Sequence, residues 1–304
     1  MLPPMTLSAR ELGRITASTE AIARGVGVRG LINIQFAMLS DTLYVIEANP
    51  RASRTVPFAS KATGVQLAKA AALIQVGRTI ASLRDQGLLP GRDARTIPDG
   101  GSIAVKAAVL PFKRFRTAAG EVVDTVLGPE MRSTGEVMGI DRDFPTAFAK
   151  SQLGAFTELP TRGTVFISIA DTDKRAIVLP AARMAELGFT VLATSGTASV
   201  LRRNGIAAQV VRKSSEGRGA EGEPTVVDLI NEGRIDLVVN TPQRSANRHD
   251  GYRIRAAAAA HDRPAVTTLQ AFNAVVQAIE VRARGAYSVR SLQEWDSHRS
   301  KEAR

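Results

Sequence analysis

Two short apolar stretches end in polar residues whose types suit a divalent cation. The stretches are Leu31–Ala37 and Thr42–Glu47, which we predict to form a β-hairpin because turn residues separate two β-prone runs. Residues two apart share one face of a strand, so we expect Gln35, Glu47 and, just past the second strand, Asn49 to lie near one another. Two amide oxygens and a carboxylate suit Mg²⁺, which also keeps ligands from a bound phosphate.

Two arginines, Arg51 and Arg54, follow this donor set directly. Their guanidinium groups have the geometry to bind carboxylate or phosphoryl oxygens. From spacing alone, a hairpin with solvated polar ends is an equally good interpretation of all these residues. The pattern by itself therefore leaves a metal and phosphate site and an ordinary hairpin as alternatives.

The rest of the first half mixes helices with isolated strands. Ser8 and Glu11 have the spacing of a helix N-terminal cap, and apolar residues recur at helical spacing over residues 8–26. We predict a domain boundary near residues 153–162. Further predicted elements are a helix over 65–76, a loop over 86–101 and strand-like segments at 103–110 and 127–139.

Beyond this boundary, short apolar strands alternate with helices. This alternation predicts a parallel sheet covered on both faces. In such open sheets, ligands bind at the carboxyl ends of the strands, where helix N-termini point. The predicted strands are 163–169, 189–193, 207–211, 235–240 and 265–268, and the predicted helices are 174–187, 196–204, 225–232, 251–261 and 269–283.

Hydroxyl, amide and lysine side chains follow these strands at the edge where ligands bind. Backbone N–H groups at the helix starts add a preference for anions. Each residue alone is equally well explained as an ordinary helix cap, but several at one edge favour a nucleotide monophosphate site. The residues are Ser168, Lys174, which we place in the first turn of the following helix, Thr194, Thr197, Lys213 and Asn240.

Composition narrows the classes of protein. A length of 304 residues predicts two domains, and the net charge of +11 is divided almost equally between the two halves. Aromatic residues make up only 5% of the chain, so the basic residues lack the stacking partners of a nucleic-acid surface. The absence of cysteine excludes disulfides and thiolate sites. We expect a soluble, cytoplasmic protein with neither a nucleic-acid nor a membrane partner.

Four runs of residues carry a resemblance to a known family. The runs Val28–Ala37, Ile46–Phe58 and Ser60–Gly64 closely resemble the second ATP-grasp half of the carbamoyl-phosphate synthetase large chain. Leu127–Gly139 is a second long match to the same family. The alternating half looks like the family's C-terminal regulatory domain, of methylglyoxal-synthase-like fold, so the resemblance covers nearly the whole chain in order.

The resemblance implies an α/β protein of two domains. Residues 1–155 would form a partial ATP-grasp domain of α+β type, 156–285 a doubly wound parallel-sheet methylglyoxal-synthase-like domain, and 286–304 a polar tail. An ATP-grasp domain also has an upstream portion with a glycine-rich loop, and only one predicted helix precedes the first strand here. We therefore expect the chain to resemble the last part of a longer protein and to lack synthetase activity alone.

The resemblance also implies a reaction. The family is an ATP-dependent ligase that makes carbamoyl phosphate from bicarbonate, glutamine-derived ammonia and two ATP, for arginine and pyrimidine biosynthesis. A separate glutamine-hydrolysing small subunit supplies the ammonia. Gln35, Glu47 and Asn49 match the family's ligands for Mg²⁺ or Mn²⁺, and Arg51 and Arg54 match arginines that bind phosphate or substrate.

The family's regulatory domain binds allosteric nucleotides such as UMP or IMP, and sometimes ornithine. The six residues at the predicted sheet edge match the implied nucleotide positions. Ala107 stands where members typically have a glutamate associated with ornithine, and Pro242 replaces a hydroxyl residue that some members carry. Ala107 therefore leaves ornithine binding open, and Thr267, at the end of the last predicted strand, is a further residue available to an effector site.

Two alternatives belong to other classes of function. One is a stand-alone nucleotide-binding regulatory module that docks to a partner. The other is a methylglyoxal-synthase-like lyase, for which His249 and Asp250 offer general acid and base groups. Thr241 stands where the lyase pattern has an aspartate, so a solvated His-Asp pair at a helix start is the favoured interpretation.

Overall fold

A computed structural model describes residues 1–91, 101–116, 120, 122–128, 130–133, 135–155, 157–241, 248–285 and 287–295. Two compact units divide the chain. The N-terminal unit comprises Met1–Val105, Ile140–Asp143 and Ser288–Arg304. The sheet unit comprises Lys106–Gly139 and Phe144–Tyr287.

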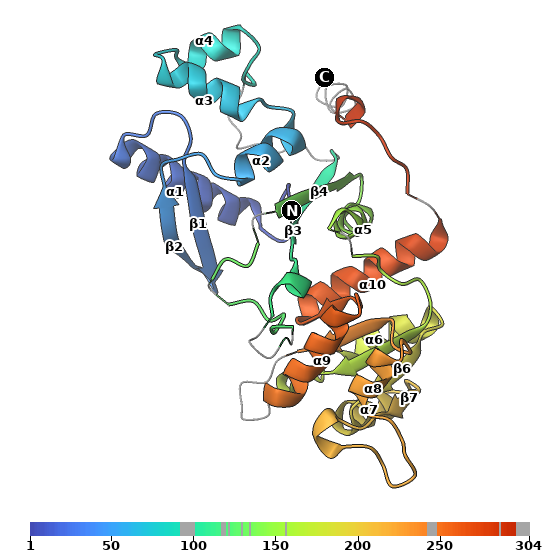
Figure 1. The fold of residues 1–304 in the computed structure, drawn as a ribbon. Helices are drawn as coiled ribbons and strands as arrows, with labels where there is room; N and C mark the ends of the chain where they lie inside the picture. Colours follow the sequence, from blue (N-terminus) through green and yellow to red (C-terminus); the bar gives the residue numbers. More distant parts are fainter. Residues whose placement is uncertain are drawn as a thin grey trace. The chain divides into compact units, whose positions relative to one another are not determined.

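The N-terminal unit begins with a capped helix and a hairpin (Figure 1). Ser8 caps the helix, because its Oγ accepts a hydrogen bond from the Glu11 N–H while the Glu11 carboxylate accepts one from the Ser8 N–H. The predicted helices at 8–26 and 65–76 and both hairpin strands are confirmed, whereas α2 and α4 were not predicted. The elements are α1 (Ala9–Val26), β1 (Asn33–Leu39), β2 (Thr42–Asn49), α2 (Thr55–Thr63), α3 (Leu67–Gln75) and α4 (Ile80–Asp85).

Along the chain, two strands and a helix come between these elements and the parallel sheet. β3 (Ile103–Val109) and β4 (Gly135–Asp141) form a two-stranded sheet, with the 3₁₀ turn η1 (Phe112–Arg114) between them in the chain. The predicted strand at 103–110 is confirmed, and β4 covers the end of the 127–139 segment. Helix α5 (Phe144–Gly154) was not predicted. The domain boundaries proposed from the sequence stay a prediction.

The sheet unit contains a five-stranded parallel sheet in the order β7-β6-β5-β8-β9. All five predicted strands and the helices between them are present, which confirms the doubly wound α/β architecture. The strands are β5 (Thr164–Ser168), β6 (Thr190–Ala193), β7 (Ala208–Val210), β8 (Leu237–Asn240) and β9 (Ala265–Val266). The helices are η2 (Asp171–Asp173), α6 (Val178–Glu186), α7 (Ser195–Arg203), η3 (Ser214–Glu216), α8 (Val226–Asn231), α9 (Arg248–Ala260) and α10 (Leu269–Arg284).

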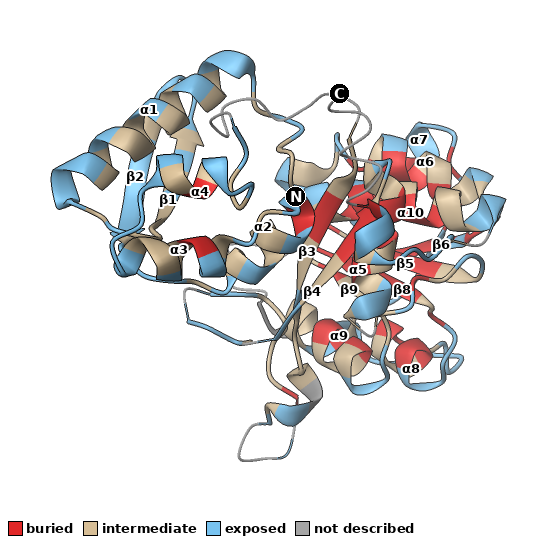
Figure 2. Ribbon diagram, turned by 90° about the horizontal axis from the view of Figure 1, so that it is seen from above, coloured by how far each residue is buried: buried red, intermediate tan, exposed pale blue. Residues whose placement is uncertain are grey.

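Alternating side chains of the sheet build two cores. On β5, Val165 and Ile167 join one buried cluster with residues of α6, α7 and α10, while Phe166 joins a second cluster with residues of α8 and α9. Figure 2 shows this burial over the parallel sheet, whereas α1 and the hairpin are coloured intermediate or exposed. Both large apolar clusters of the described residues therefore lie in the sheet unit.

Burial in the N-terminal unit is sparse by comparison. The buried apolar side chains described there are Ala62, Ala70, Leu83, Ala104, Val105, Ile140 and Trp295. Trp295 belongs to the stretch predicted as a polar tail, yet its exposure is only 4%. The hydrophobic effect consequently stabilises the described part of the sheet unit more than that of the N-terminal unit.

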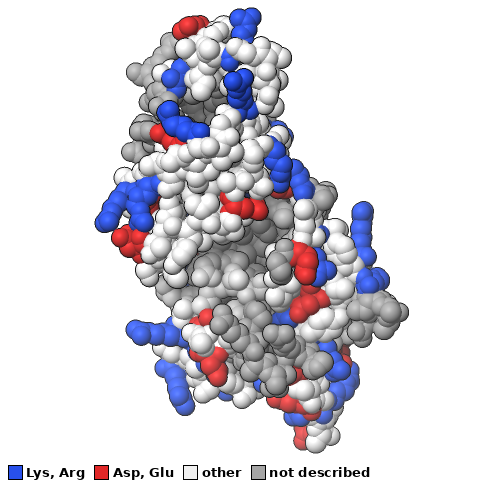
Figure 3. All heavy atoms as spheres, turned by 90° about the vertical axis from the view of Figure 1, so that its left-hand side faces the viewer, with Lys and Arg blue, Asp and Glu red and all other residues white. Residues whose placement is uncertain are grey.

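Two surface properties bear on the expected partners. None of the described helices is long and apolar enough to cross a membrane. On the face drawn in Figure 3, Lys and Arg side chains are interspersed with Asp and Glu. On this face the described side chains therefore form no uninterrupted basic patch.

Candidate functional site

The hairpin brings the first predicted donor set onto one face. In the antiparallel pair β1–β2, Gln35 lies opposite Glu47, and Asn33 lies opposite Asn49. Opposite residues project to the same side of a sheet, and Asn49 shares a face with Glu47 because it lies two positions further along β2. The predicted common face of Gln35, Glu47 and Asn49 is confirmed.

This face of the hairpin is open to ligands. Along β1, Gln35 and every second residue after it are exposed, while the residues between them are half-buried. Glu47 is also exposed and Asn49 is half-buried. The register shifts between Gln35 and Phe36, where β2 carries one additional residue.

Sequence reasoning missed one member of this face, Asn33. Its spacing of two from Gln35 is the signal that identifies it, because both must point the same way in a strand. Its side chain is half-buried opposite Asn49. Among the described residues there is no cluster of three or more His, Cys, Asp or Glu. An oxygen site here therefore has one carboxylate, Glu47, and amide oxygens.

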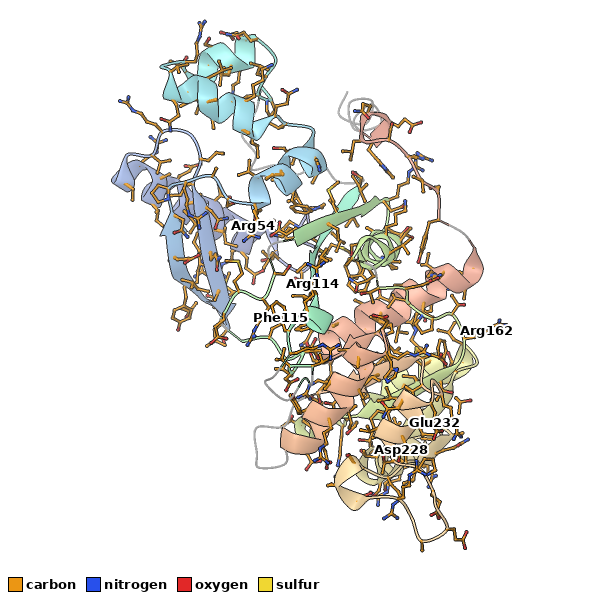
Figure 4. The ribbon with its side chains drawn as sticks, viewed as in Figure 1. Arg54, Arg114, Phe115, Arg162, Asp228 and Glu232 are labelled. Atoms are coloured by element: carbon orange, nitrogen blue, oxygen red, sulfur yellow. The ribbon has the colours of Figure 1, made fainter. Side chains whose placement is uncertain are left out.

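The two arginines lie in the turn that leaves β2. The Arg51 N–H donates to the Asn49 carbonyl oxygen over 2.8 Å, which begins this turn directly after the donor set. The Arg51 guanidinium donates to the Ala52 carbonyl, and Arg54 immediately precedes α2 (Figure 4). Both side chains are exposed. Their role in binding phosphate or substrate stays a prediction.

The second predicted site lies where the parallel sheet reverses its strand order. β5 has β6 on one side and β8 on the other, so the carboxyl ends of β5 and β8 border the switch point at which open sheets bind ligands. Ser168 and Asn240 are register partners there, and the Asn240 amide donates to the Ser168 carbonyl over 3.2 Å. Asn240 is 5% exposed. Both predicted residues are thus at the binding edge.

The start of α7 lies at the same edge, after β6. Thr194 and Thr197 are buried, and the Thr194 hydroxyl donates to the Thr197 hydroxyl oxygen over 3.3 Å. Thr194 is the N-cap residue, but its side chain does not cap the helix. The first N–H groups of α7 therefore point away from β6 without a capping oxygen from Thr194, a favourable arrangement for an anion.

Lys174 does not lie in the first turn of a long helix, which corrects the sequence prediction. The chain instead forms η2, and α6 begins only at Val178. Two aspartates at the start of this segment favour the short turn. The Lys174 ammonium nevertheless reaches α7, since its Nζ lies 3.2 Å from the point that a Cβ on Gly196 would occupy.

Asp171 is a partner of the predicted site residue Lys174 that sequence reasoning missed. Its carboxylate forms a 2.6 Å ion pair with Lys174, and its side chain is 83% exposed. A hydrogen bond from Lys174 and the charge of this lysine lower the pKa of Asp171, and the charge of Lys213 acts in the same direction. The spacing Asp-x-x-Lys was the available signal. Lys174, Lys213 and Asp171 therefore share one electrostatic neighbourhood.

The residues of the lyase alternative have structural partners. Both oxygens of Asp250 accept hydrogen bonds from Ser215, through its N–H and its hydroxyl. The Thr241 hydroxyl oxygen accepts from the Ala170 N–H. The His249 side chain and Pro242 lie outside the described residues. Asp250 thus joins η3 to the start of α9, and the interpretation of residues 249 and 250 as a solvated pair stays a prediction.

Two residues considered for an effector, Ala107 and Thr267, lie in or directly after strands. Ala107 lies in β3, and Thr267 directly follows β9. Thr268, next to it, caps α10 by accepting a hydrogen bond from the Ala271 N–H. Thr267 therefore lies at the carboxyl end of its strand, as predicted.

Two families match this chain. The family "Carbamoyl-phosphate synthase L chain, ATP binding domain" matches residues 1–83, and the family "MGS-like domain" matches residues 176–267. The first match contains the hairpin with its donor set. The second contains α7 and the carboxyl ends of β6, β7 and β8.

Solved structures add little to these matches. A methylglyoxal synthase from Elizabethkingia anophelis is 21% identical with a TM-score of 0.32, covering 39% of this chain and 79% of its own. A biotin carboxylase domain of a single-chain bacterial carboxylase is 22% identical with a TM-score of 0.38, covering 50% and 38%. Similarities this low support no further argument.

Relatives match nearly the whole chain. The carbamoyl phosphate synthase large chain of Beutenbergia cavernae is 65% identical over 300 residues, covering 99% of this chain and 27% of its own length. That of Kineococcus radiotolerans is 62% identical over 300 residues, covering 97% and 27%. The chain thus spans about a quarter of the length of these relatives. It belongs to the carbamoyl phosphate synthase large-chain family and corresponds to the C-terminal portion of its members.

Proposed function

We propose that residues of this chain serve carbamoyl phosphate formation from bicarbonate, glutamine-derived ammonia and ATP, in arginine and pyrimidine biosynthesis. The observation that carries this proposal is the common face of Gln35, Glu47 and Asn49, which Arg51 and Arg54 follow in the next turn of the chain. In this proposal the partners are the rest of a large chain and a glutamine-hydrolysing small subunit. The relatives' name, a large chain, supports a multi-part enzyme.

The donor chemistry of the hairpin fits Mg²⁺ or Mn²⁺ shared with a nucleotide. One carboxylate and amide oxygens leave most of the coordination sphere to water and phosphate, which is how proteins usually bind Mg²⁺ with ATP. A bound metal ion would neutralise phosphate charge during phosphoryl transfer. The chain's own contribution is to hold the donors on one hairpin face and to carry Arg51 and Arg54, both exposed, in the turn that follows β2, where their guanidinium groups are available to phosphate or substrate oxygens.

A polypeptide of residues 1–304 alone is expected to form no carbamoyl phosphate. The donor face is exposed on one side, and the described residues of the N-terminal unit build no large apolar cluster that would support a closed nucleotide site. The measurement is ATP-dependent product formation from bicarbonate and ammonia by the purified polypeptide. A full-length relative, such as that of Beutenbergia cavernae, is the positive control. Activity above background would contradict the prediction.

For the sheet unit, we propose binding of a nucleotide monophosphate such as UMP or IMP as an allosteric effector. The supporting observation is the position of the Lys174 ammonium at the start of α7, with Thr194, Thr197 and Lys213 at the same edge. A phosphate there would accept from backbone N–H groups and from a lysine. Both large apolar clusters of the described residues lie in the sheet unit. This supports the second candidate function, a stand-alone nucleotide-binding regulatory module.

Replacing Lys174 by alanine is expected to weaken UMP binding about tenfold or more, because a charge-assisted contact to phosphate is lost. Calorimetry with UMP and IMP measures the affinity. Lys69→Ala, which removes the same charge from an exposed position of α3, is the matched control and should bind as the unsubstituted chain does. Equal affinities for both variants would contradict the assignment of Lys174.

A further inference from the structure

A buried arginine connects the proposed nucleotide site to the segment between β3 and β4. Arg255 of α9 is 4% exposed. Its Nε and Nη2 donate to the two carboxylate oxygens of Asp124 over 2.6 and 2.5 Å. Its Nη1 donates to the side-chain oxygen of Asn240. One planar guanidinium thus joins a carboxylate and the switch-point asparagine, and its fork geometry fixes both contacts together.

The carboxylate belongs to a short segment that is fastened to α9 at two points. The Tyr252 hydroxyl donates to the Val122 carbonyl over 3.0 Å, three residues before Arg255 on the same helix. Asp124 also accepts from the Val126 N–H, which orders the turn that follows. Residues 122–126 lie within the stretch that the sequence assigns to the synthetic half of the chain. A displacement of α9 would therefore also displace residues 122–126 or break these hydrogen bonds.

Asn240 keeps one amide hydrogen to donate to a ligand. Its side-chain oxygen is taken by Arg255, and one of its two amide hydrogens by the Ser168 carbonyl. The surroundings are filled, since a Cβ on Gly251 would lie 2.7 Å from Arg255 Nη1 and 3.1 Å from the Asn240 oxygen. A ligand that accepts a hydrogen bond from the remaining amide hydrogen would consequently shift the Asn240 side chain. The oxygen of that side chain accepts from Arg255, so the shift would reach the arginine.

We propose that the Arg255–Asp124 ion pair transmits occupancy of the nucleotide site to residues 122–126. The inference rests on the proposed nucleotide site and adds its route of regulation. The two states are the paired and the loosened arrangement of Arg255, and a nucleotide biases them through its contact with Asn240. Coupling is reciprocal, so loosening the ion pair must also change nucleotide affinity.

Hydrogen–deuterium exchange on residues 1–304, with UMP as the probe, tests this route. In the unsubstituted chain, saturating UMP should slow exchange at the start of α7 and change exchange at 122–126 by threefold or more. In Asp124→Asn, protection at α7 should persist while the change at 122–126 disappears, and UMP affinity should shift by threefold or more. Asp124→Glu keeps the charge and should recover part of the change.

Control variants separate this route from general loosening. Asp41→Asn removes an arginine-paired carboxylate of the N-terminal unit and should leave all UMP responses unchanged. If Asp124→Asn fails to fold by circular dichroism, Arg255→Lys gives the same test, because it keeps a charge and loses the fork. If UMP and IMP do not bind the unsubstituted chain, the nucleotide site itself is wrong and the route falls with it. If UMP binds and exchange at 122–126 does not respond, or responds equally in Asp124→Asn, the route alone is wrong.

Discussion

Arg255→Met should destabilise the sheet unit by about 3 kcal/mol, because removing one partner of a buried ion pair leaves the other charge and a buried asparagine oxygen unpaired. The value lies at the lower end of the range for buried pairs, since the Asp124 side chain retains 34% exposure and some hydration. Urea unfolding followed by far-UV circular dichroism measures the loss as a lower midpoint at unchanged slope.

The neighbouring Arg253 provides the control. It is exposed, and its one described side-chain contact is a 3.4 Å hydrogen bond to Ser214, so Arg253→Met should stay within about 0.5 kcal/mol of the unsubstituted protein. Equal losses of unfolding free energy in the two variants would contradict a stabilising role for the buried Arg255 ion pair.

Acid should erase the difference between Arg255→Met and the unsubstituted protein. Burial acts to raise the pKa of Asp124, but hydrogen bonds from Arg255 and from the Val126 N–H outweigh it and lower the pKa. A lowered folded-state pKa means that the stabilisation is present above the ordinary aspartate pKa of about 3.9 and is lost as pH falls through the folded value. The stability gap should therefore narrow only below about pH 4.

Gly139→Ala is expected to destabilise the sheet unit by about 3 kcal/mol or more, because two backbones approach each other at this glycine. A Cβ there would lie 2.0 Å from the Ala147 carbonyl oxygen and 2.5 Å from the Ser151 nitrogen, both in α5. These atoms belong to the backbone, so α5 must shift away from β4. Thermal unfolding should show a clearly lower midpoint.

Gly154→Ala is a matched control from the same two elements. A Cβ at Gly154 would meet the Val137 Cβ at 3.4 Å, an ordinary packing distance. This substitution should change stability by less than about 1 kcal/mol. If both alanine variants unfold at the same temperature, the close approach of β4 and α5 does not limit stability.

Much of the sheet unit was predictable from sequence because each strand is a short apolar run bounded by turn residues and followed by a helical pattern. The edge carrying Ser168, Thr194 and Asn240 follows from that alternation, since carboxyl ends of parallel strands meet. The hairpin face was predictable for a similar reason. The strict two-residue period of a strand places Gln35 and Glu47 together once the turn is located.

Other features depend on long-range contacts that no local pattern encodes. Asp124 and Arg255 are far apart in the chain, and nothing in either neighbourhood marks them as partners among so many charged residues. The 3₁₀ turn before α6 displaced Lys174 from its predicted helix, because local aspartates compete with helix formation there. Helix α5 escaped prediction because its packing on α10, rather than a strong amphipathic pattern, supports it.

The Asp171–Lys174 pair gives the proposed nucleotide site a tethered competitor. A carboxylate three residues away is present at an effective concentration on the order of millimolar or more, so it competes with weak single-charged anions for the lysine. A phosphate group, with a charge near −2 and three acceptor oxygens, competes better. Released Asp171 returns to water at little cost because its side chain is already mostly exposed. In the proposed nucleotide site, the pair would thus favour phosphate esters over chloride or small carboxylates.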